Sequence, residues 1–123
     1  MASVSVALEG KVIHATYVGT MTMDLVKDGE RQIEAMVAQV QWPSVLYDTR
    51  AMATPTVGLA LEMKNFDSRV AKKITRSATV VSDAGTAFCA KIAFVFSREH
   101  KVFYHDIESA VAWLGGAKLA SAV

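Results

Sequence analysis

The chain has 123 residues, a length that fits a single domain of ordinary size. Hydrophobic residues make up 52% and charged residues 20%, which excludes a disordered chain and indicates a well-filled core. The 13 basic and 12 acidic residues nearly balance, and the single cysteine excludes an internal disulfide and a cysteine-based zinc site. Since we find neither a signal-peptide pattern nor an apolar run of membrane-spanning length, we expect a cytoplasmic protein without integral membrane association.

Apolar residues alternate in the short segments of the chain and recur at helical spacing in the longer ones. The predicted strands are residues 3–8, 11–18, 44–49, 78–81 and 101–104. The predicted helices are residues 22–41, 54–67 with a basic second piece to 74, 84–97 and 106–114. Strands alternate with helices after an opening hairpin, which predicts an α/β domain with a mostly parallel sheet of about five strands and four helices. We expect residues 1–116 to form this domain and residues 117–123 to form a flexible tail.

Single residues set the predicted helix boundaries. The predicted N-caps are Thr20 or Thr22, Thr54, Asp83 and Asp106. Pro55 follows Thr54 as the first helical residue, where its missing N–H costs nothing, and Gly115-Gly116 is predicted to end the last helix. Gly29 in the middle of the first helix costs about 1 kcal/mol relative to alanine, so we expect it to mark a close approach to the sheet.

The helix predicted over residues 84–97 is apolar on all sides. Its only charged residue within the run from Ala84 to Phe96 is Lys91. A helix of this kind must be covered on every side, and a domain this small does not offer enough of its own surface. We therefore expect a second subunit or a bound ligand against it, and a homodimer is the predicted assembly.

Three segments together resemble the SpoIIAA-like family, small bacterial domains with a STAS-type fold. They read VLYDTRAM (45–52), SATVVSD (77–83) and KVFYHDIESAVAWL (101–114). The last is the most specific, because Phe103, Ala110 and Trp113-Leu114 stand at the spacing of the family's closing motif. The resemblance implies a (βα) superhelix, a non-enzymatic role in regulation or ligand binding, and frequent dimers. It also extends to the CRAL/TRIO type of lipid-binding domain.

The well-known STAS domains in this group are anti-sigma factor antagonists that are phosphorylated on a serine in an Asp-Ser-Ser-Gly turn. The corresponding turn here reads Ala53-Thr54-Pro55-Thr56, without the acid and without the serines. The family's phosphorylation site is therefore not carried over as it stands. Two hypotheses stay open for Thr54 and Thr56: a phosphate-regulated switch, and a plain helix cap at Thr54.

Three acids follow predicted parallel strands, where open α/β sheets bind ligands. Asp83 and Asp106 directly precede helices and are assigned as caps. Asp48 has no such duty, and Arg50 is near enough to hold it by a charge-assisted bond. Bracing of the loop by this pair and contact of Asp48 with a ligand both remain as hypotheses.

Catalysis, metals and nucleic acids have little support in the sequence. His14, His100 and His105 lack the spacing of metal ligands, and we expect no metal or cofactor. A small enzyme using Asp48 with His105 remains a minor alternative. The basic residues around Lys72 are not interleaved with aromatics, so they indicate a solvated helix face rather than a nucleic-acid site.

Methionine and aromatic side chains from two predicted helices and a strand indicate either an apolar ligand space or an ordinary core cluster. They are Tyr47, Met52, Met63, Phe66 and Phe88. The full candidate ligand- or partner-binding set is Tyr47, Asp48, Arg50, Met52, Thr54, Thr56, Met63 and Phe88. The sequence thus predicts a non-enzymatic domain that binds a regulatory protein or a small apolar, lipid-like molecule at the strand-end rim.

Overall fold

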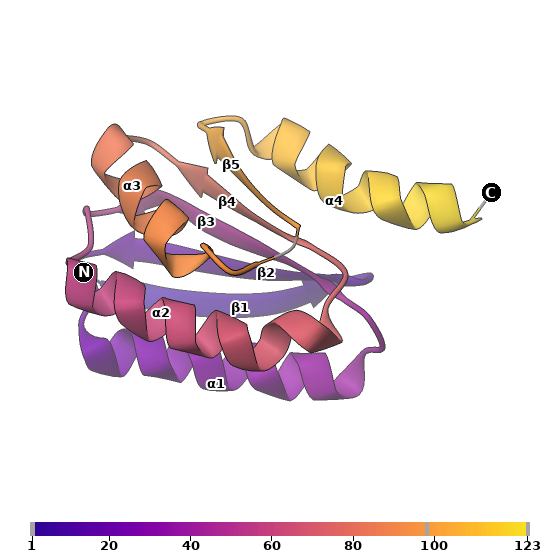
Figure 1. Ribbon diagram of the computed structural model, residues 1–123, viewed down its shortest axis with the longest axis horizontal. Helices are drawn as coiled ribbons and strands as arrows, with labels where there is room; N and C mark the ends of the chain where they lie inside the picture. The colour runs from indigo at the N-terminus through magenta and orange to yellow at the C-terminus, as the bar shows by residue number, and fades with distance from the viewer. Residues whose placement is uncertain (1, 98, 123) are drawn as a thin grey trace.

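The computed structural model describes residues 2–97 and 99–122 and forms one five-stranded sheet with the strand order β1-β2-β3-β4-β5 (Figure 1). The strands are β1 (Ser3–Glu9), β2 (Val12–Gly19), β3 (Ser44–Met52), β4 (Ser77–Val81) and β5 (His100–Tyr104). β1 pairs antiparallel with β2, and each of the next three pairings is parallel. The predicted α/β class with a mostly parallel sheet is confirmed, and the opening hairpin makes the sheet mixed.

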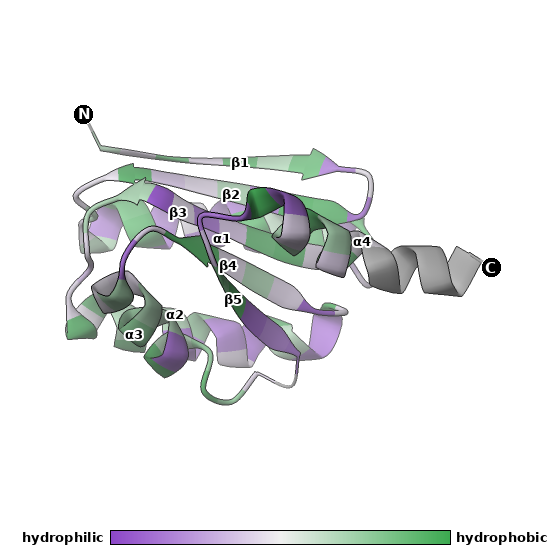
Figure 2. Cartoon of the chain, turned by 90° about the horizontal axis from the view of Figure 1, so that it is seen from above, coloured by the Kyte–Doolittle hydropathy of each residue, from purple (hydrophilic) through white to green (hydrophobic). Residues whose placement is uncertain are grey.

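The helices cover the two faces of the sheet unequally. They are α1 (Met23–Gln39), α2 (Val57–Val70) with a short 3-10 turn η1 (Ala71–Lys73), α3 (Ala84–Ala93) and α4 (Ile107–Ala122). The larger core cluster lies between one face of the sheet and helices α1, α2 and α3. The smaller cluster lies between the other face and α4 (Figure 2). In the part of the chain that the structure describes, none of the helices combines the length and apolar character that a membrane crossing requires.

Strand β3 carries the core, because its first six residues are buried on both faces. Successive side chains alternate between the two faces. Val45 and Tyr47 therefore enter the larger cluster beneath α1 to α3, and Leu46 enters the smaller cluster beneath α4. This two-sided burial is typical of a parallel strand between helical layers.

Helix α1 lies very close to the sheet at Gly29. A Cβ atom at this position would stand 2.7 Å from Cγ1 of Val4 on β1, nearer than real Cβ atoms come to a neighbour. The close approach expected from the sequence is therefore confirmed. Thr22 is the N-cap of α1, and its hydroxyl accepts the backbone N–H of Leu25 at 3.2 Å.

Two helix ends differ from the sequence prediction. α3 ends at Ala93 rather than near residue 97, so Val95 and Phe96 belong to the connection that follows it. α4 continues through Gly115-Gly116 to Ala122, because the following alanine-rich stretch favours the helix by more than the two glycines cost. The predicted stop at Gly115-Gly116 is wrong; Val123 lies outside the described residues, and a domain boundary after residue 116 stays a prediction.

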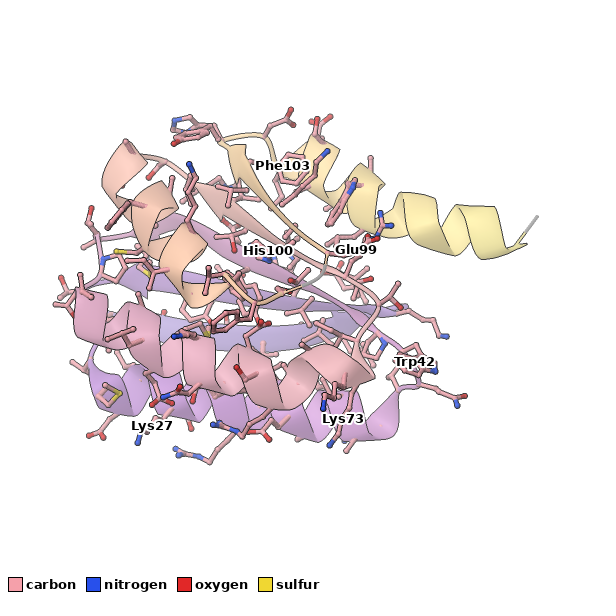
Figure 3. All side chains as sticks on the ribbon, viewed as in Figure 1. Lys27, Trp42, Lys73, Glu99, His100 and Phe103 are labelled. Carbon is pink, nitrogen blue, oxygen red and sulfur yellow. The ribbon has the colours of Figure 1, made fainter. Side chains whose placement is uncertain are left out.

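His100, the first residue of β5 (labelled in Figure 3), has a structural role: its ring contacts side chains of β4 and the residue that follows α3. Its Nδ1 is 2.6 Å from the Ser77 hydroxyl, and its Nε2 is 3.0 Å from the Thr79 hydroxyl. The ring of Phe94 stacks on it with centroids 3.8 Å apart. Burial lowers the pKa of His100 to about 3, so the imidazole is neutral and serves to tie the edge strand β5 to β4.

We predict that Gly29→Ala lowers the free energy of unfolding by about 1–3 kcal/mol despite the better helix propensity of alanine, because the new methyl group must displace Val4. Urea unfolding followed by circular dichroism measures the change. Gly58→Ala in α2 is the matched control, since a Cβ there meets nothing closer than 3.8 Å, and we expect it to be neutral or stabilising. Equal stabilisation by both variants would contradict the close approach.

Candidate functional site

The loop between β3 and α2 forms the strand-end rim with the start of α3. Thr56 is the N-cap of α2, and its hydroxyl accepts the backbone N–H of Leu59 at 3.2 Å. The predicted cap at Thr54 with Pro55 as first helical residue is therefore wrong by two residues. The reason is a tertiary bond: the Thr54 hydroxyl donates to Oδ1 of Asp83 at 3.2 Å and joins this loop to the next one.

Asp83 organises the second half of the rim. It is the N-cap of α3, as predicted, and accepts the backbone N–H of Thr86 at 2.7 Å. This bond, together with those from the hydroxyls of Thr86 and Thr54, lowers the pKa of the Asp83 carboxyl below its usual value. Asp106 accepts the N–H of Ser109 at 2.9 Å just before α4, in the capping role predicted for it.

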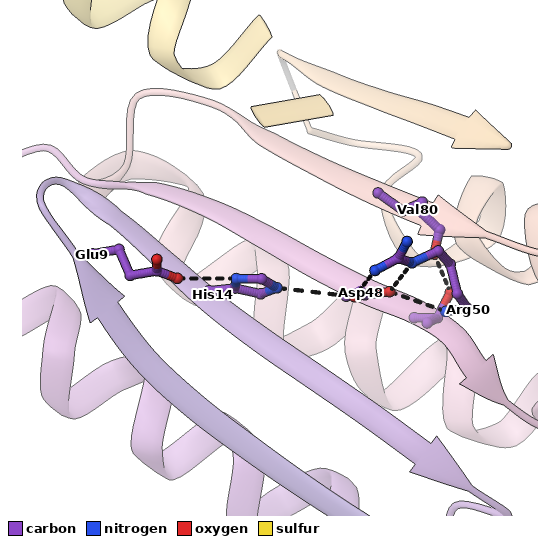
Figure 4. Close-up of polar contacts among 6 residues, drawn as sticks. Glu9, His14, Asp48, Arg50 and Val80 are labelled. Atoms are coloured by element: carbon purple, nitrogen blue, oxygen red, sulfur yellow. Dashed lines mark hydrogen bonds and ion pairs between the residues drawn. The ribbon is translucent and has the colours of Figure 1, made fainter. Parts of the chain in front are cut away.

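Asp48 does not lie on this rim, because β3 continues to Met52 instead of ending at residue 49. Its carboxylate forms a two-pronged ion pair with Arg50, with nitrogen–oxygen distances of 2.9 and 2.8 Å (Figure 4). Burial would raise the pKa of Asp48, but the hydrogen bonds and charge of Arg50 outweigh it and hold this pKa below its usual value. The pairing expected from the sequence is present, and contact of either residue with a ligand stays a prediction.

A histidine completes this polar row on the face of α4. His14 on β2 has Nδ1 at 3.2 Å from Glu9 and Nε2 at 4.0 Å from Asp48 (Figure 4). The sequence analysis placed His14 in a strand without assigning it a role. His105, the predicted partner of Asp48 in an enzyme, follows β5, and β4 separates β5 from β3. The acid and base of that alternative belong to strands that do not pair.

A small apolar cavity of about 70 Å³ lies between the sheet and helices α2 and α3. Three of the candidate residues, Tyr47, Met52 and Met63, line it, together with Leu59 and Phe94. Phe66 and Phe88 are not among its lining residues: Phe66 is fully buried in the core, and 59% of Phe88 is exposed. Cys89 lines the cavity with its thiol 3.6 Å from the Pro55 carbonyl, and burial raises the pKa of this thiol.

Large apolar side chains are exposed over α2 and α3, from the rim toward the opposite end of the sheet. We call this set the α2–α3 apolar surface: Val57, Leu61, Phe88 and Phe96. Val57 and Leu61 are one turn apart on α2, and Phe96 lies against Lys64 of the same helix, whose ammonium group is 5.0 Å from the ring centroid. Phe88 precedes Cys89, which contacts Pro55, so this ring lies near the start of α2. The helix predicted to need a cover thus buries one side and exposes the other.

Acidic and phenolic groups are buried together between α1, α2 and the sheet. Glu30 and Asp67 are 3% and 2% exposed. Within the described part of the chain, the hydroxyls of Tyr17 and Tyr47, Oε2 of Glu30 and Oδ1 of Asp67 have no hydrogen-bond partner. In the sequence Glu30 is directly followed by Arg31, and charged residues of this kind favour the solvent-exposed side of a helix. The spacing of Glu30, four residues from Val26 and three from Ile33, is the signal that places it on the buried side.

The buried position changes the chemistry of Glu30. Burial first, and then a hydrogen bond and negative charge from Glu62 on α2, raise its pKa to about 8. Arg69 opposes this shift only weakly, at 3.9 Å from Oε1. Burial also raises the pKa of Asp67 to about 6. Among the residues that the structure describes, no group of three or more acidic, histidine or cysteine side chains is placed to hold a metal ion.

We predict that the free energy of unfolding falls between pH 6.5 and pH 8, by up to about 1.4 kcal/mol per pH unit. The folded state keeps the Glu30 proton up to about pH 8, whereas the unfolded chain releases it near 4.5, so stability is lost as the pH rises through this window. Urea titrations at several pH values measure the slope. Glu30→Gln should flatten it and Glu108→Gln, an exposed control on α4, should not; an unchanged slope in Glu30→Gln would contradict the assignment.

Comparison with known proteins identifies the fold. The chain is similar to an uncharacterised protein of the DUF3478 family with a SpoIIAA-like fold from Shewanella loihica, with a TM-score of 0.72, 17% identity, and coverage of 93% of this chain and 95% of that one. An anti-sigma factor antagonist from Mycobacterium paratuberculosis gives a TM-score of 0.65 at 17% identity, covering 93% and 94% of the two chains.

A third structure is the anti-sigma factor antagonist SpoIIAA in its unphosphorylated form. It has a TM-score of 0.66 at 12% identity, and the match covers 93% of this chain and 97% of that one. A search of curated proteins finds no match. The profile of the SpoIIAA-like family matches residues 12–115, from the second strand of the hairpin into α4. The chain therefore belongs to the SpoIIAA-like family.

Proposed function

We propose that this chain is a non-enzymatic regulatory domain of the cytoplasm that binds a protein partner at the strand-end rim. The observation that carries the proposal is the α2–α3 apolar surface: Phe88 on α3 is 59% exposed, and Phe96, which is 72% exposed, extends the surface along α2 to Lys64. Aromatic side chains of this kind are typical of protein interfaces. The likeness of the fold to anti-sigma factor antagonists supports the same class of function.

A homodimer is the second part of the proposal. The α2–α3 apolar surface includes Phe88 and Phe96 from the segment that the sequence predicts to need a cover, and a second copy of the chain can supply that cover. Protein partner and second copy would then compete for the same side chains. This competition is a simple physical basis for regulation, because assembly of one complex removes the surface needed for the other.

A small apolar ligand remains a narrower alternative. The cavity beneath α2 and α3 is lined by methionines, whose flexible side chains adapt to different occupants. Its volume of about 70 Å³ holds only a few heavy atoms, so a lipid-like chain would have to displace Met52 and Met63. The exposed surface is the stronger support, because it needs no rearrangement.

Capture of partners from a lysate of the source cells tests the surface. The tagged chain is co-expressed with an untagged copy and purified through its tag. We expect the untagged copy and one specific protein to be purified with it. Replacement of Leu61 and Phe88 by serine should abolish both, because two exposed apolar contacts are lost. Val111→Ser on α4, which changes a residue 45% exposed on the other face, is the matched control and should retain them. Equal recovery by both variants would rule out the α2–α3 apolar surface.

Regulation by phosphate is a further part of the proposal, and the rim geometry favours Thr56 over Thr54. A phosphate on Thr56 would lie at the N-terminus of α2, where backbone N–H groups and the helix dipole favour negative charge. A phosphate on Thr54 would face the carboxylate of Asp83, which the hydroxyl now contacts at 3.2 Å. Thr56 is therefore the better acceptor on electrostatic grounds.

We predict that incubation with lysate of the source cells and Mg-ATP modifies Thr56 and leaves Thr54 unmodified. Peptide mass spectrometry locates the phosphate. Thr56→Val should lose the modification, whereas Thr54→Val, which removes only the bond to Asp83, should keep it. If both threonines stay unmodified in the wild-type chain, the phosphate switch is excluded under these conditions and partner binding must be regulated in another way.

A further inference from the structure

The end of the sheet opposite the rim carries a pocket of about 690 Å³, within the usual size range of small-molecule sites. Its walls come from the C-terminal part of α2 and η1 and from the segments that lead into β3, β4 and β5. Figure 3 shows Trp42 and Glu99 at this end, where those strands begin. The pocket therefore lies at the end where the parallel strands begin, whereas the rim lies where they end. Phe96 belongs to both the pocket wall and the α2–α3 apolar surface.

Asp67 is the unusual member of the pocket wall. It is 2% exposed, and among the side chains that the structure describes its Oδ1 has no hydrogen-bond partner. Burial raises its pKa to about 6, so most molecules still carry a negative charge there at neutral pH. A buried carboxylate without a partner is costly, and a cationic hydrogen-bond donor would remove that cost.

The other charged groups of the wall restrict the ligand further. Arg76 is already paired with Glu99 at 2.8 Å, and its guanidinium lies over the ring of Trp113 at 4.4 Å. Lys72 forms no ion pair within the described ranges 2–97 and 99–115, for which side chains are placed. Its ammonium group is thus available for an anion, while Asp67 is available for a cation.

Trp42 supplies a flat apolar surface at the mouth of the pocket. Its side chain is 56% exposed, and its backbone has a φ of 55°, a conformation that a bulky residue rarely adopts. The strain is maintained by the surrounding loop, in which the hydroxyl of Thr75 donates to the Trp42 carbonyl at 2.9 Å. An exposed indole held in this way can stack on a ring or an apolar chain.

We propose that this pocket binds a small zwitterionic compound of the amino-acid class, with its ammonium group on Asp67, its carboxylate on Lys72 and an apolar ring on Trp42. No residue of the α2–α3 apolar surface other than Phe96 takes part. The inference goes beyond the proposed partner binding, and either one can fail without the other.

Three probes of equal ring size separate the two charged contacts. L-phenylalanine carries both charges, phenethylamine only the ammonium group, and hydrocinnamate only the carboxylate. Isothermal titration and the fluorescence of Trp42 measure binding to the whole chain, with Trp42→Phe as the control that leaves Trp113 as the only fluorescent indole. We expect L-phenylalanine to bind about tenfold more tightly than hydrocinnamate, the ratio that one charged hydrogen bond provides.

Variants assign each contact. Asp67→Asn should remove the advantage of L-phenylalanine over hydrocinnamate, and Lys72→Gln should remove its advantage over phenethylamine. Asp28→Asn, on the exposed face of α1, is the control and should change neither. Circular dichroism confirms that each variant is folded. Equal binding of L-phenylalanine and hydrocinnamate, unchanged ratios in Asp67→Asn, or no binding of any probe at millimolar concentration would each overturn the proposal.

Discussion

The burial of β3 on both faces is the constraint on which the rest of the structure depends. Six consecutive residues of this strand are buried, so helices must cover the sheet from both sides. The alternation of side chains then separates neighbours in the sequence: Tyr47 reaches the cavity beneath α2 and α3, and Asp48 pairs with Arg50 on the face of α4. Two candidate residues that are adjacent in the chain consequently serve different surfaces.

The polar groups buried between α1 and α2 run against the usual rule that such groups are satisfied. Burial, and then the hydrogen bond and negative charge of Glu62, raise the pKa of Glu30 to about 8, so the contact between the two helices is sensitive to pH. α2 is also the helix that carries Thr56, Val57 and Leu61. The packing beneath α2 and the surface it presents are therefore physically connected through one rigid element.

The two ends of the parallel strands have different chemistry. The carboxyl ends lead into well-capped helices, whose caps Thr56 and Asp83 satisfy the first N–H groups, beside an apolar surface suited to a protein. The amino ends enclose a pocket with the buried Asp67, whose Oδ1 has no partner among the described residues, and an exposed indole at Trp42, features that support the proposed small charged ligand. The two proposals thus assign two recognition surfaces to a single domain of the SpoIIAA-like family.

The sequence by itself determined the order of strands and helices, the parallel winding, the close approach at Gly29 and the caps Asp83 and Asp106, and it narrowed the first cap to Thr20 or Thr22. These features depend on residues near one another in the chain, such as apolar periodicity and side-chain bonds to the next turn. It also paired Asp48 with Arg50, two residues apart. The family resemblance rested on the same local strings, and the match over residues 12–115 confirms it.

Only the tertiary structure decided the start of α2, the burial of Glu30 and Asp67, and the location of Trp42 beside a pocket. Thr54 lost its predicted capping role because Asp83, 29 residues away, accepts its hydroxyl. α4 passed through two glycines because no single residue type fixes a helix end when its neighbours favour continuation. The end of α4 follows from local helix propensity, but the other outcomes depend on the balance between burial and bonding across elements distant in sequence, which local patterns do not encode.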